Sequence, residues 1–109
     1  EGYSTSSLKH GPFALLEPDF PVILLAFKDE YYAKSMNAYE EIKSRNAEIL
    51  IITDDQDCNL PNSIIIPEND TFRHLLSIIP MQILGYELSI SRGLNPDMPR
   101  NLAKVVTVE

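Results

Sequence analysis

The last residues of the chain, 97–109, read DMPRNLAKVVTVE and set one lysine, Lys104, among apolar neighbours. Pro99 suits the first position of a helix, which would place Arg100 and Lys104 four residues apart on one face. Repulsion between the two cations and an apolar setting would both lower the pKa of the lysine. Since only a neutral amine attacks a carbonyl carbon, this setting predicts a lysine that can form an imine. The alternative, which spacing alone favours, is a lysine whose charged end reaches water from a docked tail.

A second candidate for chemistry is His10, in the segment SSLKHGP. Gly11 and Pro12 direct the backbone sharply after the imidazole, and a titratable ring held at a turn can pass protons near neutral pH. A loop histidine without a function is the alternative. His74 lies in TFRHLL, which is predicted to be helical, and we interpret it as a structural or surface residue.

An acidic cluster, Asp54, Asp55 and Asp57, follows a predicted strand directly. At the carboxyl end of a parallel strand such acids could hold Mg²⁺ or accept a phosphoryl group. More often they cap a helix or stay solvated, and a phosphorylation switch of the receiver type needs a lysine after the last strand, where SIIIPEND has none. We therefore predict no metal site. The serine-rich stretch at 4–7 lacks the glycines of a phosphate loop and is read as a polar turn.

Three short apolar runs, at 21–27, 48–53 and 63–67, have the composition of strands buried on both faces of a parallel sheet. Residues 29–46 between the first two predict a crossover helix with Asp29 as its N-cap. Its apolar stripe is Tyr32, Met36, Tyr39 and Ile42. Tyr31, Tyr32 and Tyr39 are interpreted as core or interface aromatics.

A strongly apolar helix is predicted after the third strand, with Asn69, Asp70 or Thr71 as its cap. Pro80 should kink or restart this helix, which ends at Gly93. Residues 8–16 are also expected to be helical. Alternation of strand and helix predicts an α/β fold with three α/β/α layers and a mainly parallel sheet.

The composition excludes several classes of partner. Nine Lys and Arg against sixteen Asp and Glu give a net charge of −7, which argues against nucleic acid and anionic membranes. Cys58 is the only cysteine, so there is no disulfide framework and no zinc-ligand spacing, and a cytoplasmic location is expected. No apolar run is long enough to cross a membrane. Three strands are few for such a sheet and the chain opens at EGY, so we expect it to be a piece of a longer protein.

Three segments carry a family resemblance: SLKHGPFALLEPDFPV, IPMQILGYELSISRGLNPDMPRNLAK and the terminal VTVE. Together they closely resemble the carboxy-terminal end of the glucosamine-6-phosphate synthases, the glutamine–fructose-6-phosphate aminotransferase family. The resemblance implies an isomerase of two sugar-isomerase (SIS) subdomains with a flavodoxin-like fold. Residues 1–109 would form part of the second subdomain, with an active-site tail at 94–109, and no cofactor is implied.

The resemblance also implies roles for individual residues. Lys104 would form the imine with fructose 6-phosphate, and the backbone of Ala103 would help to hold the sugar. His10 would assist opening of the sugar ring and would reach the active site of the neighbouring subunit. The terminal tail would cover the site and border a channel for ammonia.

Several parts of the family's machinery do not match any residue here. The glutamate base, the phosphate-binding loops of the first SIS subdomain and the glutaminase domain with its amino-terminal cysteine have no counterpart, and Cys58 stands at the wrong place. We therefore expect this chain alone to be inactive. The family's strand order is 2-1-3-4-5, and the chain would begin within the second strand, near residues 1–3.

The strand that would lie between residues 1–3 and the run at 21–27 is missing. We therefore expect a displaced amino-terminal segment or a homodimer that covers the open edge. The alternative function is a non-catalytic SIS module that senses a sugar phosphate. A lysine within an apolar tail favours the enzyme, because imine formation requires it and sensing does not.

Overall fold

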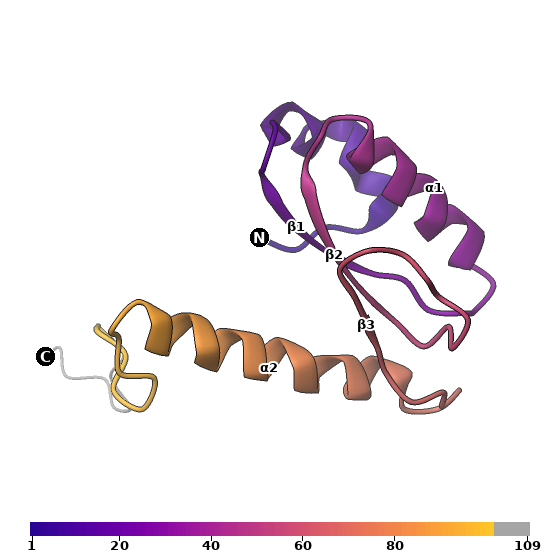
Figure 1. Ribbon diagram of the computed structural model, residues 1–109. Helices are drawn as coiled ribbons and strands as arrows, with labels where there is room; N and C mark the ends of the chain where they lie inside the picture. Colours follow the sequence, from indigo (N-terminus) through magenta and orange to yellow (C-terminus); the bar gives the residue numbers. More distant parts are fainter. Residues whose placement is uncertain (102–109) are drawn as a thin grey trace, which may run out of the picture. The chain divides into compact units, whose positions relative to one another are not determined.

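The computed structural model describes residues 1–101 (Figure 1). Lys104 and Ala103 lie outside the described residues. Contacts divide the chain into two compact units, Glu1–Ser77 and Ile78–Glu109, which are described separately below. The elements in chain order are the 3₁₀ helices η1 (Thr5–His10) and η2 (Pro12–Leu15), β1 (Pro21–Leu25), α1 (Tyr32–Lys43), β2 (Glu48–Thr53), β3 (Ser63–Ile65) and α2 (Arg73–Ser91).

The three strands form one parallel sheet in the order β1-β2-β3. Pro21 pairs with Glu48 at one end of β1, and Leu25 pairs with Ile52 at the other. The α1 helix connects β1 to β2, so the predicted α/β class and crossover helix are confirmed (Figure 1). The expected strand near residues 1–3 is not formed, because Glu1–Ser4 carry no regular structure. Among the described residues β1 therefore has a partner on one edge alone.

One face of the sheet packs against α1 and holds the larger core. This cluster is made by Leu24, Ala26, Tyr39, Ile42, Ile49 and Ile51, with Tyr32 and Met36 packed against it. The predicted stripe of α1 is therefore confirmed, since Tyr39 and Ile42 are 2% and 1% exposed. Burial of apolar area at this face is what holds α1 on the sheet. Tyr31 is exposed.

The other face of the sheet carries a smaller cluster of Phe27, Ile52 and Ile66, against which Ile64 and Leu76 pack. The apolar side chains of β1 on this face, Ile23 and Leu25, are about two-fifths exposed. β1 is thus apolar on both faces but covered on only one. This is typical of a sheet whose second helical layer is only partly present.

The α2 helix runs without interruption through Pro80, so the predicted restart there is wrong. Proline removes one backbone donor, but the rest of the hydrogen-bond ladder persists on both sides of it. The predicted cap is confirmed at Asn69, whose side-chain oxygen accepts the N–H groups of Thr71 and Phe72 at 3.1 and 2.8 Å. Within the described part of the chain, no helix combines the length and the apolar character needed to cross a membrane.

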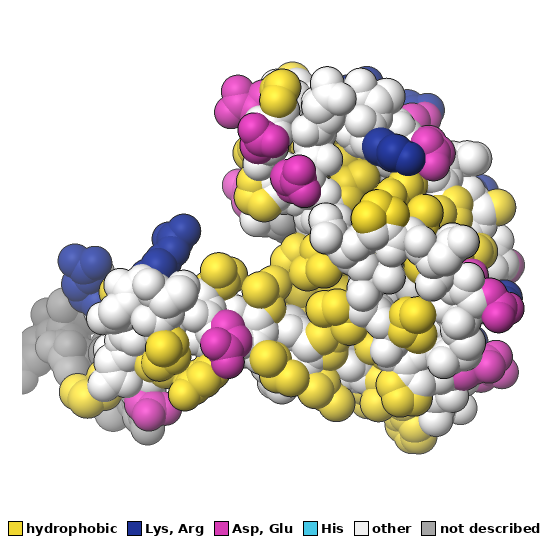
Figure 2. Space-filling model, in the orientation of Figure 1, with side chains coloured by type: hydrophobic (Ala, Val, Ile, Leu, Met, Phe, Trp, Pro, Cys, Tyr) yellow, Lys and Arg dark blue, Asp and Glu magenta, His cyan; other side chains and the backbone are white. Residues whose placement is uncertain are grey.

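Hydrophobic side chains line the surface of α2 (Figure 2). The exposed ones are Leu75, Ile78, Ile79, Met81, Ile83, Tyr86, Leu88 and Ile90. A helix that is apolar around most of its circumference is typical of the interior of a larger protein.

Candidate functional site

His10 lies at a sharp turn between two short 3₁₀ helices. It is the last residue of η1, and Pro12 begins η2. Gly11 between them has φ 149°, in the region that side chains other than glycine rarely adopt. The predicted helix at 8–16 is therefore broken into two single turns at Gly11. This break leaves the imidazole exposed, and among the described residues its ring forms no hydrogen bond or ion pair.

The turn that carries His10 is held against the α1 side of the sheet. Leu8 and Phe13 are half-buried against the larger core. Lys9 Nζ lies 2.8 Å from a carboxylate oxygen of Glu41 on α1. The guanidinium of Arg45 lies 4.0 Å from the centre of the Phe13 ring. The turn is thus held by apolar packing against the larger core and by two contacts that involve cations, Lys9 with Glu41 and Arg45 with Phe13.

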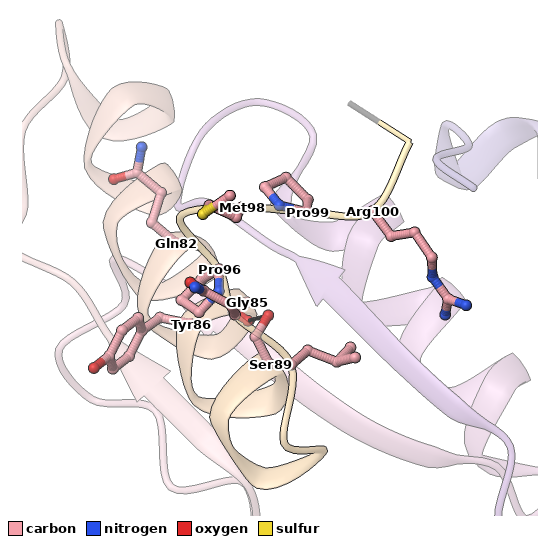
Figure 3. Close-up of a pocket in the computed structure, with 10 residues that line it drawn as sticks. Gln82, Gly85, Tyr86, Ser89, Pro96, Met98, Pro99 and Arg100 are labelled. Carbon is pink, nitrogen blue, oxygen red and sulfur yellow. Dashed lines mark hydrogen bonds between the residues drawn. The ribbon is translucent and has the colours of Figure 1, made fainter. Parts of the chain in front are cut away.

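The segment that leads to the terminal lysine follows α2 in the second unit. Residues 94–100 run back along the last turns of the helix and line an open hollow of about 610 Å³ (Figure 3). Gln82, Tyr86 and Ser89 line it from the helix, and Arg100 lies at its edge. The prediction of a short helix that starts at Pro99 is wrong, because Asn101 has φ 67°, outside the helical region.

In the structure the acidic cluster forms two sets of charged contacts that join elements. Asp54 is 1% exposed and accepts the backbone N–H of Lys28 at 2.6 Å. Its second carboxylate oxygen lies 3.3 Å from the guanidinium of Arg73, which also contacts Asp70. These contacts link the carboxyl end of β2 to the loop that follows β1 and to the first turn of α2.

Asp55 forms the other charged contact. Its two oxygens accept bonds from Lys28 Nζ at 2.9 Å and from the Tyr32 hydroxyl at 2.8 Å. The hydrogen bonds from Lys28 and Tyr32 hold the pKa of Asp55 below its usual range. Burial, together with the bond to Asp55, raises the pKa of Tyr32 to about 12. The hydrogen bond to Asp55 likewise raises the pKa of Lys28. At neutral pH this trio holds one anion, one cation and one neutral phenol.

The remaining candidates form other contacts within the described residues. Among residues 1–101 no group of three His, Cys, Asp or Glu side chains is placed to hold a metal ion. His74 packs edge-on against Phe27 with 4.9 Å between ring centres, which confirms its structural interpretation. The hydroxyls of the serine-rich turn bond to one another. Cys58 is a partly exposed free thiol.

Sequence reasoning missed the cations that meet the acidic cluster. The lysine partner of Asp55 follows β1 rather than the last strand, where the receiver-type pattern requires one. Arg73 stands at the start of a predicted helix beside a strand end, and this position is a usable signal for an ion pair.

The pattern that defines the SIS domain matches residues 1–92. The chain belongs to the SIS domain family. This membership confirms the SIS domain that the resemblance implied, together with the α/β fold class. It also accounts for the parallel sheet with a crossover helix.

Similar proteins extend the comparison over the whole chain. A probable glutamine–fructose-6-phosphate aminotransferase (isomerizing) of Acanthamoeba polyphaga mimivirus is 53% identical over 112 aligned residues, which cover 100% of this chain and 18% of that protein. The enzyme of that name from Chlorobaculum tepidum is 42% identical, with 100% and 19% covered. The C-terminal domain of the glucosamine-fructose-6-phosphate aminotransferase of Francisella tularensis superimposes with a TM-score of 0.74 at 26% identity, covering 85% of this chain and 28% of that one. The chain thus spans less than a fifth of the length of the mimivirus and Chlorobaculum tepidum relatives.

Proposed function

We propose that this chain is the carboxy-terminal part of a glutamine–fructose-6-phosphate aminotransferase, which makes glucosamine 6-phosphate from fructose 6-phosphate and glutamine-derived ammonia. The observation that carries the proposal is the alignment of all residues of the chain with enzymes of that name at 53% and 42% identity. Their alignment reaches the end of the chain and therefore includes the NLAK segment. A non-catalytic sensing module would not need the lysine of this segment.

His10 is proposed to open the sugar ring. In the ring form of fructose 6-phosphate the oxygen on C5 is bonded to C2. Opening breaks that bond, so the ring oxygen gains a proton while the hydroxyl on C2 loses one and becomes the carbonyl. An imidazole can supply the first proton, provided that it lies within hydrogen-bond reach of the ring oxygen. His10 is exposed at the end of η1, so its ring is accessible to a bound sugar.

Lys104 is proposed to receive the open-chain ketose. The neutral amine attacks C2, water leaves and an imine forms between the lysine nitrogen and the sugar. Ammonia then replaces the lysine. Movement of a proton from C1 to C2, and of the hydroxyl proton on C1 to the nitrogen, gives the amino aldose. Ala103 is proposed to hold the sugar through its backbone. The base for the proton shift, the phosphate-binding loops and the glutaminase domain would lie elsewhere in the longer protein, so this chain alone should be inactive.

The proposal includes an assembly and a compartment. A homodimer of this chain alone is supported by the edge of β1 that has no partner among residues 1–101 and by the exposed apolar side chains of β1, since an unpaired apolar edge recruits a partner. A cytoplasmic location is supported by the single unpaired thiol.

The test is chemical trapping in the full-length enzyme that carries this sequence. Cyanoborohydride reduces an imine to a stable amine, so fructose 6-phosphate in its presence should attach to Lys104, as read by peptide mass spectrometry. Lys104→Arg should lose the adduct and the synthesis of glucosamine 6-phosphate, whereas Lys43→Arg on the exposed end of α1 should keep both. An adduct on another lysine, or undiminished synthesis by Lys104→Arg, would refute the proposal.

A further inference from the structure

We infer that Glu41, in the last turn of α1, and Arg45, two residues beyond its end, are positioning residues for His10. The inference rests on the function proposed above, in which His10 acts on the sugar ring. Neither residue would touch the substrate. Each holds one side of the turn that carries the imidazole.

The turn has little internal support of its own. Neither η1 nor η2 contains a fully buried residue. The bond from Ala14 N–H to the Gly11 carbonyl, 2.9 Å, closes η2 but does not fix its direction relative to η1. Gly11 permits many backbone conformations because it lacks a side chain. The direction of His10 is therefore set by what the flanking residues contact.

The contact before His10 is the ion pair of Lys9 with Glu41, 2.8 Å long. Its two side chains are 67% and 36% exposed, so water weakens the attraction. This pair orients the residue directly next to the imidazole but holds it only softly.

The contact after His10 is a cation–π contact. The flat guanidinium of Arg45 lies 4.0 Å from the centre of the Phe13 ring, which is half-buried against the core. Arg45 is itself fixed, because one of its nitrogens donates to the backbone carbonyl of Glu41 at 2.6 Å. One turn at the end of α1 therefore holds both flanks of His10, and a shift of the turn would move the imidazole.

Such a shift matters because proton transfer depends steeply on geometry. A donor must lie within hydrogen-bond distance of the oxygen that it protonates, and small misplacements lower the rate. Loss of the Arg45 contact should consequently slow ring opening specifically, rather than every step of the reaction.

The experiment uses the full-length enzyme that carries this sequence and two substrates. Fructose 6-phosphate must be opened, whereas 5-deoxyfructose 6-phosphate has no hydroxyl on C5 and cannot close the ring. The ratio of the two kcat/KM values isolates ring opening, since both are measured on one preparation. A variant that is partly unfolded lowers both values and leaves the ratio unchanged. His10→Asn should lower this ratio more than any of the other variants.

Arg45→Met and Phe13→Leu should each lower the ratio by about two- to fivefold, the equivalent of one cation–π contact. Glu41→Gln should lower it by about twofold or less, as expected for an exposed ion pair. The matched controls are Lys43→Met and Glu40→Gln, which alter the same helix without touching the turn, and both should leave the ratio unchanged.

The outcomes separate the two proposals. If His10→Asn does not change the ratio, the proposed role of His10 in ring opening fails. If His10→Asn changes it while Arg45→Met and Phe13→Leu behave like the controls, His10 keeps its role and the positioning inference is overturned.

Discussion

Replacing Arg73 by methionine leaves the Asp54 carboxylate buried without its cationic partner. The Arg73 side chain is 8% exposed and that of Asp54 is 1% exposed, with 3.3 Å between the nearest guanidinium nitrogen and carboxylate oxygen. Methionine keeps much of the apolar volume of the arginine stem and removes the charge. The change therefore removes the charged contact with Asp54 and the contact with Asp70, whose side chain is 91% exposed and contributes little.

The expected loss is large for so small a domain. Two unit charges at this separation attract by about 5 kcal/mol at an effective dielectric constant of about 20. Removal of one partner of a buried pair commonly costs about 3–5 kcal/mol, because the other charge stays buried. The hydrogen bond from the Lys28 N–H, 2.6 Å long, remains and continues to stabilise Asp54. We therefore expect Arg73→Met to lower the free energy of unfolding by about 3 kcal/mol.

Urea unfolding followed by circular dichroism measures this loss. Arg92→Met is the matched control, because Arg92 is exposed just beyond the end of the same helix, and it should change the free energy by less than about 0.5 kcal/mol. The double variant Asp54→Asn with Arg73→Met removes both charges and should be more stable than Arg73→Met alone. If the double variant instead loses the sum of the two single losses, an unpaired buried charge is not the cause and the reasoning is wrong.

Three further predictions concern other parts of the chain. Gly11→Ala should lower the free energy of unfolding by about 1 kcal/mol, because φ is 149° there, whereas Asn46→Gly at φ 58° should change it by less than about 0.5 kcal/mol in the same urea titration. Since the pKa of Tyr32 is raised to about 12, the folded chain keeps a proton that the unfolded chain loses near pH 10. Stability should therefore fall as the pH rises from about 10 to about 12, and Tyr32→Phe should reduce that slope in unfolding curves collected across this range. Ile42→Ala should cost about 3 kcal/mol, because this side chain is 1% exposed in the larger core, and a thermal midpoint within a degree of the parent's would contradict its place there.

The sequence by itself predicted the three strands, the crossover helix and the long apolar helix after β3. Continuous apolar runs marked the three strands, and the 3.6-residue period of Tyr39 and Ile42 marked the buried face of α1. It also supplied the LKHGP and NLAK segments, which carry the resemblance to the family. These features are local, because a period or a motif lies within a few neighbouring residues.

The tertiary structure alone decided which charges meet. Lys28 and Asp55 lie 27 positions apart, and nothing in the spacing of either indicates the other. The contact of Arg45 with Phe13 likewise depends on how the His10 turn packs on the end of α1. The period of a helix or strand determines which side chains face the core, but partners from different elements are chosen by the packing of those elements on the sheet. For this reason the strands and the family could be read from the sequence, while the Asp54–Arg73 pair and the support of His10 could not.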